Sequence, residues 1–571
     1  MRAAAVRRGL SAILLAAVLV VGFASTGSAQ TGSSQRVFVI DVPGVSFEEL
    51  LSVPEVLVLA RAGGAALMRN QDPVRQGYPP YPELVPGNTR IAEWEMDPAT
   101  MGGLDMVGAT IRERVEGAGV AEVLVIVESR TGSLEMAEAK DELHPLVMAV
   151  GAPQELFGAV GEPAALTSDT TRRIGVVTDL DVYPTIGGFL GGEPAADWAG
   201  SLIRVVDTPA PFGLHERYLA QRRMYVPIGT GGALYLTVIG LLGVAFVAFP
   251  RLGWGVIRRT VGWGCLSVAT LGTGMIAAGH LPDLTYATVV PFIAIVTVLG
   301  TMAFSPLERR SPVLVPVGIG AAVLAFFALE AVLGWDAVLT PFLGGSHLDG
   351  GRFYGLPNTA IGLLVGASLW IAQRLQTWIG VGLLVVVALV VGMPYLGSNL
   401  GGGVTLFASA GMWLAVRERE RFGPWKGLAA VGVSVLLGAA LLLLAHRLSP
   451  LPTHVTRFEE ATAGLGDVWQ TFVDRLGVGF DLIRRNPAAL VPILVLPLAL
   501  VATLRPPASI RTTFERWPAW RDAVLVTLLS GVVAYIVNDT GPAAAGQAVG
   551  LGLGGMLGVS LLAGPGKMGG S

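Results

Sequence analysis

The chain has 571 residues, 52% of them hydrophobic and 14% charged, and its net charge divides into −12 over residues 30–223 and +6 over residues 224–571. Soluble domains carry about 25% charged residues, so this composition, with a mean hydropathy of +0.62, excludes an ordinary soluble enzyme and a disordered chain and favours a multi-span membrane protein. A single Cys excludes a disulfide framework within the chain, and 6 His leave little room for a zinc-rich site.

The N-terminus has the pattern of a secretory signal. Three arginines within the first eight residues precede an apolar run at 10–23, and small residues follow as far as Ala29. This order predicts a signal peptide over residues 1–29, with an uncleaved anchor helix as the alternative. In both cases the next segment begins outside the membrane.

Residues 30–223 have the pattern of a soluble α/β domain. Ser46 and Glu49 have the spacing of a capping box and predict a helix that reaches about Arg61. Strands and helices alternate, which favours a mostly parallel sheet covered on both faces. The stretch 72–88, rich in Pro, Gly and Tyr, is expected to be an irregular loop. The expected strands are 36–41, 121–127, 146–150 and 173–177, and a second helix is expected at 179–190.

Residues 224–571 contain about eleven apolar runs that suit membrane helices, each of which needs about 20 residues. Of the 21 Lys and Arg in this part, 15 lie in alternate connecting loops and in the C-terminal tail. The positive-inside rule places those loops and the C-terminus in the cytoplasm and the soluble domain outside the plasma membrane. The expected spans are 224–249, 261–280, 284–304, 313–334, 357–373, 377–393, 402–416, 427–446, 488–504, 522–538 and 544–563.

One predicted outside loop, residues 447–486, differs from the other loops. It carries five Arg, and its apolar residues recur at roughly helical spacing. This pattern predicts an amphipathic segment that lies on the outer membrane surface or caps the bundle. A miscounted span nearby is the alternative.

Two stretches of the soluble part resemble alkaline phosphatase-like domains. The run Val37-Phe-Val-Ile-Asp41, followed by a helix and a small-residue turn, resembles the opening of that fold, where the first strand ends in a metal-binding Asp. The stretch 143–186, which ends in Asp181-Val-Tyr-Pro-Thr-Ile186, is similar to the end of the same fold. The resemblance covers about residues 35–192 and implies an α/β domain of this class.

The chemistry of that superfamily does not carry over well. Its hydrolases hold two divalent metals with several Asp and His beside a Ser or Thr nucleophile. Asp41 matches the first ligand, but residues 30–223 contain only His144 and His215, neither at a ligand position of the pattern, and Thr89 is a weak match for the nucleophile. We therefore predict a non-catalytic domain without a cofactor, in which Asp41 is a vestigial metal ligand or a strand-end carboxylate satisfied by helix N-termini.

Polar residues of the membrane part gather in three loops on the predicted outside. The Arg352 guanidinium suits a phosphate or carboxylate, and the asparagines suit a sugar or pyrophosphate. The alternative is that these are ordinary turn residues. Glu330, a carboxylate inside an apolar run, is expected to pair with an Arg such as Arg352 or to lie in water at the outer interface. The candidate ligand-binding residues are His347, Asp349, Arg352, Tyr354, Asn358, Asn399, Asn538 and Asp539.

The order of these parts is itself a pattern. A phosphatase-like domain followed by R-F-Y-G-x-x-N (352–358), S-N-x-G-G (398–402) and N-D-T-G (538–541) resembles a group of membrane proteins of Gram-positive bacteria. The G-x-x-N portion is also similar to one loop of O-antigen ligase-type membrane enzymes.

These features predict a cell-envelope protein whose outward-facing membrane cavity binds, moves or presents a lipid-linked or phosphorylated precursor. The expected partners are membrane lipids and a lipid-linked glycan or polyprenyl phosphate. Nucleic acid is not expected, because the basic residues follow the membrane topology. One alternative is a glycan ligase or glycosyltransferase in which Arg352 holds pyrophosphate and His347 or Asp349 acts as base. The other is an active metal-dependent ectophosphatase.

Overall fold

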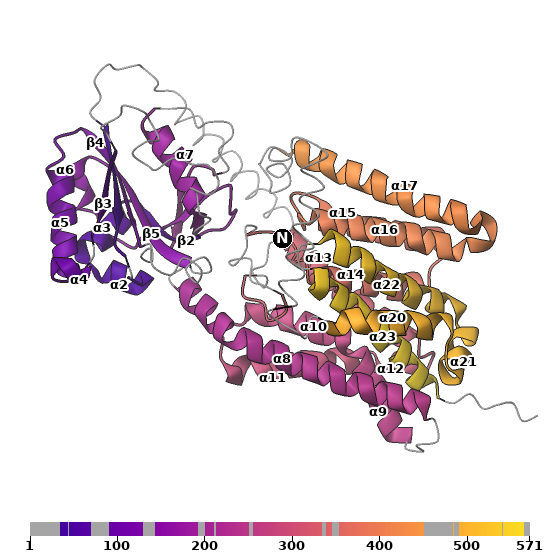
Figure 1. The fold of residues 1–571 in the computed structure, drawn as a ribbon. Coiled ribbons are helices and arrows are strands. Elements are labelled where there is room, and N and C mark those ends of the chain that lie inside the picture. Colours follow the sequence, from indigo (N-terminus) through magenta and orange to yellow (C-terminus); the bar gives the residue numbers. More distant parts are fainter. Residues whose placement is uncertain are drawn as a thin grey trace, which may run out of the picture.

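A computed structural model shows a sheet domain and a helical bundle joined by a long helix, α8 (Gly213–Ala248) (Figure 1). The predicted signal peptide and the stretch 72–88 lie outside the described residues, as does nearly all of the predicted amphipathic segment 447–486. The structure describes residues 35–43, 45–69, 91–96, 98–129, 143–191, 200–210, 213–249, 255–333, 339–344, 353–449, 484, 490–538 and 541–564.

The sheet domain is built on eight strands, which are β1 (Gln35–Asp41), β2 (Gly64–Arg69), β3 (Ile91–Glu95), β4 (Glu122–Glu128), β5 (Leu143–Gly151), β6 (Ala164–Thr167), β7 (Val176–Thr178) and β8 (Arg204–Pro209). Their order is β3-β1-β4-β5-β2-β6-β8, and β7 pairs with β2. β5 runs antiparallel to both of its neighbours, and β8 runs antiparallel to β6. The sheet is therefore mixed, although most of its described strands point one way, as the sequence predicts.

Alternate residues of the strands face opposite sides of the sheet, and each side has its own core. Phe38 and Val125 pack in one apolar cluster with α2, α3 and α5, whereas Val39 and Ile126 pack in the other with α7. This produces a three-layer domain, visible in Figure 1. The helices of the domain are α2 (Phe47–Ser52), α3 (Pro54–Ala62), α4 (Pro98–Met101), α5 (Leu104–Glu116), α6 (Pro153–Leu156) and α7 (Asp179–Phe189).

Several local predictions are confirmed and others need correction. The Ser46–Glu49 capping box is present, but the helix that it starts breaks at Val53, because Pro54 begins a second helix. The strand predicted from residue 173 starts at Val176, because Gly175 has a φ of +79° and turns the chain. The small residues after α3 do not form a turn but the fully buried strand β2.

The bundle has a helix, or a bent pair of helices, at each of the eleven predicted spans. Within the described residues, six helices are long and apolar enough to cross a membrane, or up to eight if each bent pair is one span. Its elements are α8, α9 (Gly255–Leu266), α10 (Val268–Ala277), η4 (Ala278–His280), α11 (Tyr286–Met302), α12 (Ser305–Glu308), α13 (Leu314–Leu333), α14 (Ala360–Ala372), α15 (Thr377–Gly392), α16 (Leu400–Arg417), α17 (Arg419–Arg447), α20 (Leu490–Leu504), α21 (Ala508–Arg516), α22 (Pro518–Val537) and α23 (Gly541–Ala563).

The short helix α14 and the Gly-rich helix α23 form the centre of the bundle. α14 is buried along nearly its whole length, and 72% of the most apolar window of α23 is buried, against 11% for α17. Glycine permits this close packing, since a Cβ on Gly362 of α14 would lie 2.4 Å from the carbonyl oxygen of Ala544 in α23. The exposed apolar side chains of α8 and α17 are therefore suited to contact lipid.

Ion pairs join helices at the end of the bundle that lies away from the sheet domain. We call this the far end and the end toward the sheet domain the near end (Figure 1). At the far end Arg259 pairs with Glu308 at 2.8 Å, and Arg417 and Arg419 both reach Asp522, at 3.2 and 3.3 Å. The basic loops of the predicted topology thus contribute to a common far end.

Candidate functional site

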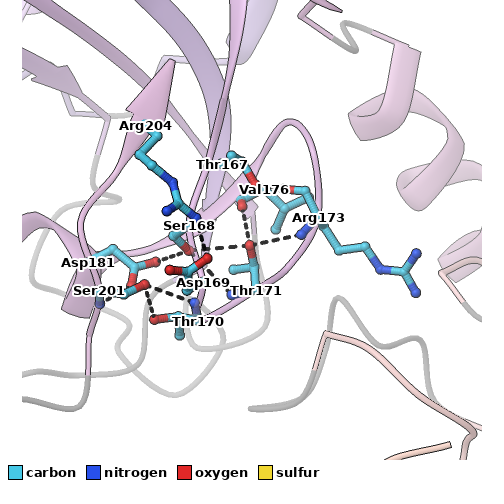
Figure 2. Close-up of polar contacts among 10 residues, drawn as sticks. All are labelled: Thr167, Ser168, Asp169, Thr170, Thr171, Arg173, Val176, Asp181, Ser201 and Arg204. Carbon is cyan, nitrogen blue, oxygen red and sulfur yellow. Dashed lines mark hydrogen bonds and ion pairs between the residues drawn. The ribbon is translucent and has the colours of Figure 1, made fainter. Parts of the chain in front are cut away.

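A polar loop of the sheet domain, residues 168–175 between β6 and β7, faces the near end of the bundle (Figure 2). Asp181 in the first turn of α7 anchors this loop. Its carboxylate is fully buried and accepts hydrogen bonds from the Ser168 hydroxyl at 2.7 Å, the Thr178 amide at 2.8 Å and the Ser201 amide at 2.9 Å. Three donors stabilise a buried charge that would otherwise be costly.

Further side chains fix the shape of the polar loop. The Thr171 hydroxyl donates to the Val176 carbonyl at 2.6 Å, and the Thr167 hydroxyl donates to the Arg173 carbonyl at 2.9 Å. On the side away from the bundle, Asp169 pairs with Arg204 (Figure 2). Asp181 belongs to the stretch that resembles phosphatase-like domains, and its observed contacts are those of a structural anchor.

Two consecutive arginines of the polar loop contact the bundle. Arg172 donates from Nη1 to the Pro394 carbonyl at 3.0 Å, and its guanidinium lies 4.0 Å from the centroid of the Tyr354 ring. Arg173 donates from Nε to the Phe353 carbonyl at 2.8 Å. Arg172 has a φ of +53°, a conformation that residues other than glycine rarely adopt. The polar loop therefore covers the loops that precede α14 and α16.

Two of the predicted ligand residues join these loops to each other. Asn399 caps α16, because its Oδ1 accepts from the Gly402 amide at 2.8 Å. Its Nδ2 donates to the Leu356 carbonyl at 3.0 Å and to Oδ1 of Asn358 at 2.8 Å. The Leu356 amide in turn donates to the Gly397 carbonyl at 2.7 Å. Residues 353–359 and 393–399, here called the outer loops, thus form one hydrogen-bonded unit.

A third asparagine, Asn538, ends α22 beside the start of α16. Its Nδ2 donates to the Ala534 carbonyl at 3.0 Å and to the Thr405 hydroxyl at 3.4 Å. Its Oδ1 is buried and has no hydrogen-bond partner among the described residues. A Cβ on Gly401 would lie 2.8 Å from this oxygen, so the close approach requires glycine at position 401.

The structure therefore brings four of the eight predicted ligand residues to the near end of the bundle. Asn358 and Asn399 are bonded to each other, Tyr354 lies under Arg172, and Asn538 packs beside α16. The Thr359 hydroxyl donates to the Leu343 carbonyl at 3.3 Å, which joins this end to residues 339–344. The other four predicted ligand residues lie outside the described part of the chain; they are His347, Asp349, Arg352 and Asp539.

A second polar group occupies the end of the sheet where the phosphatase-like resemblance predicts a metal. Asp41 ends β1 and lies in register with Glu128 of β4. Glu128 is fully buried, and each of these side chains takes part in a polar or electrostatic interaction. Among the described residues, no group of three or more His, Cys, Asp or Glu could hold a metal ion. Further buried polar residues at or directly after strand ends of this sheet include Arg69, Ser129, Thr178 and Asp179, and His144 is buried near the start of β5.

Sequence reasoning missed most of this second group. Glu128 and Arg69 are each the last residue of a strand, as Asp41 is. A charged residue at the end of an apolar strand was the sequence signal that could have identified them. His144 lies in β5, opposite Met68, and the backbone of His215 lies in the first turn of α8. Thr89 lies outside the described residues.

Glu330, the carboxylate inside the apolar run of α13, contacts a histidine, whereas Arg352, the partner suggested for it, lies outside the described residues. The Glu330 side chain is 1% exposed, and its Oε1 lies 2.5 Å from Nε2 of His280, whose side chain is 37% exposed. The alternative of a carboxylate in water at the interface is therefore wrong. His280 belongs to the short turn after α10, so the pair links α10 to α13 near the outer loops.

No family model, curated protein or solved structure matches this chain.

Proposed function

We propose that this chain is a multi-pass membrane protein of the bacterial cell envelope, and that it binds, moves or presents a lipid-linked or phosphorylated envelope precursor at the near end of its bundle. In this proposal the sheet domain is a non-catalytic, alkaline phosphatase-like domain outside the membrane. The bundle crosses the membrane about eleven times, and its C-terminus lies in the cytoplasm.

One observation carries the proposal. The Asn399–Asn358 hydrogen bond of 2.8 Å joins two loops that are 41 residues apart, at the end of the bundle covered by Arg172 and Arg173. Gly-rich starts of short or broken helices, such as α16, are typical of membrane sites that bind polar groups with backbone amides. The loop that carries Arg352 ends directly before Phe353 in this unit.

The polarity of the buried residues supports a ligand with an apolar tail and a polar head. Asn399 is 2% exposed at the start of α16, and Asn538 is 4% exposed at the end of α22. Buried amides in a membrane protein are costly unless they hydrogen-bond. A polyprenyl phosphate would place its chain in the bilayer and its head group against Arg352 and the outer loops, whose shape Asn399 fixes by its internal hydrogen bonds.

Binding of a fluorescent polyprenyl phosphate to the purified full chain in lipid nanodiscs tests this function. We expect Arg352→Ala to weaken binding by about tenfold or more, because a charge-assisted contact to phosphate is lost. Arg374→Ala, in a predicted cytoplasmic loop, is the matched control and should bind as the wild type does. Equal binding of the phosphate-free polyprenol, or no loss in Arg352→Ala, would refute the proposed site.

A further inference from the structure

The sheet domain holds the segment that directly follows the candidate ligand loop. The Phe353 side chain is fully buried and belongs to the same apolar cluster as Phe38 and Val107 of the sheet domain. Arg173 binds the carbonyl of Phe353, and Arg172 lies over the ring of Tyr354. Tyr218 of α8 and Leu339 join this cluster from the bundle side. The two parts therefore share a core as well as polar contacts.

We propose that Arg172 and Arg173 are positioning residues through which the sheet domain sets the conformation of the outer loops. This inference goes beyond the proposed function, because it concerns the coupling of the two parts and holds whatever the ligand is. It assigns the sheet domain a task that needs no catalysis.

The rigidity of the polar loop supports this role. Asp181 holds Ser168, and Thr167 and Thr171 fix the backbone around Arg173 (Figure 2), so this arginine and its neighbour Arg172 belong to a preorganised turn. The φ of +53° at Arg172 is unfavourable for a side chain, and such strain persists only where surrounding contacts maintain it. Here the strained residue is the one that reaches Pro394 and Tyr354.

The contacts beyond the arginines form a continuous path to α16. Arg172 holds the Pro394 carbonyl in one outer loop, and Arg173 holds Phe353 in the other. These loops are joined by the bond from the Leu356 amide to the Gly397 carbonyl and by the side chain of Asn399, which caps α16. Loss of either arginine should therefore loosen the hydrogen bonds of both loops.

Hydrogen exchange measured by mass spectrometry on the full chain in nanodiscs, without any ligand, tests the coupling. In the double variant Arg172→Ala/Arg173→Ala we expect amide exchange at 356 and 397–399 to rise about tenfold or more, since each arginine contributes a charge-assisted hydrogen bond. Arg204→Ala removes an arginine that contacts the other side of the same loop, and it should leave these amides unchanged.

Two further readouts separate positioning from a general loss of folding. Exchange in β4 should stay at the wild-type rate in every variant. Arg172→Ala/Arg173→Lys should keep part of the protection that Arg172→Ala/Arg173→Ala loses, because the lysine ammonium group still donates to the Phe353 carbonyl. If the double variant leaves the outer loops protected, or if Arg204→Ala exposes them equally, the inference is wrong. Because no ligand is present, these outcomes are independent of the proposed function.

Discussion

At the scale of single residues, Asp181 shows how a motif residue can serve structure. Its carboxylate joins the start of α7 to the polar loop and to Ser201, which is 20 residues further along the chain. The sequence located this residue through its resemblance to a phosphatase-like segment. It did not reveal all three donors, because Ser168 and Ser201 lie 13 and 20 residues away and become neighbours of Asp181 only in the folded domain.

Replacing Asp181 with Ala should destabilise the sheet domain. The change leaves a buried hydroxyl and two amides without their acceptor, so we expect the free energy of unfolding to fall by about 3 kcal/mol. Pulse proteolysis of the full chain in urea measures this loss. Asp169→Ala is the matched control, since it removes only a partly exposed ion pair with Arg204 and should cost less than about 1 kcal/mol. Equal stability of the two variants would contradict the anchor role.

At the scale of elements, predictability depended on how much information each segment carries locally. The start of α2 was predictable because Ser46 and Glu49 form a local capping box. β2 was not, because its six residues are all buried and show no alternation, and its pairing with β5 depends on residues about 80 positions away. The long apolar helices were predictable because an apolar run is also a local signal. The burial of α14, in contrast, depends on the helices packed around it.

The contact between the first turns of α2 and α8 predicts a dependence on pH. The Glu48 carboxyl has a raised pKa, first because it hydrogen-bonds to Glu216 and then because of the charge of Glu216. A raised pKa in the folded state means that the stabilising contribution is present at low pH and is lost as the pH rises through that pKa. At neutral pH the two carboxylates therefore repel each other.

Glu48→Gln should accordingly raise the Tm at pH 7 and have little effect at pH 4. We expect a rise of roughly 1 °C, because exposed charge pairs contribute little to stability. Thermal unfolding of the full chain at both pH values measures the difference. Glu162→Gln, another exposed carboxylate of the sheet domain, should show no such difference between the two pH values. A Tm for Glu48→Gln that falls at pH 7 would show that the pair is attractive.

At the scale of the whole molecule, charge alone predicted two parts but not how they meet. The split between −12 and +6 predicts a soluble part and a membrane part, and its boundary at 223/224 falls inside α8, the helix that joins the sheet domain to the bundle. The contact between Arg173 and Phe353 joins residues that are 180 positions apart, and no local sequence pattern predicts it. Four of the eight candidate site residues lie at one end of the bundle, and loop charge predicts that their loops share a side of the membrane.

The same charge pattern makes a prediction about orientation. The far end of the bundle carries Arg259, Arg417 and Arg419, which are costly to move across a membrane, so we expect this end in the cytoplasm and the sheet domain outside. Glu155→Cys places a thiol on an exposed position of the sheet domain, and Glu420→Cys places one on an exposed position of the far end. The native Cys265 is buried and provides a low labelling background.

Labelling of intact cells with a membrane-impermeant maleimide then distinguishes the two orientations. We expect Glu155→Cys to react in intact cells and Glu420→Cys to react only after the membrane is permeabilised. Wild-type protein, with Cys265 alone, controls for reaction inside the bundle. The reverse pattern would place the sheet domain in the cytoplasm, and the near end could then not receive a precursor from outside. Reaction of both thiols in intact cells would show that the far end is also accessible from outside and would contradict the cytoplasmic assignment of its basic loops.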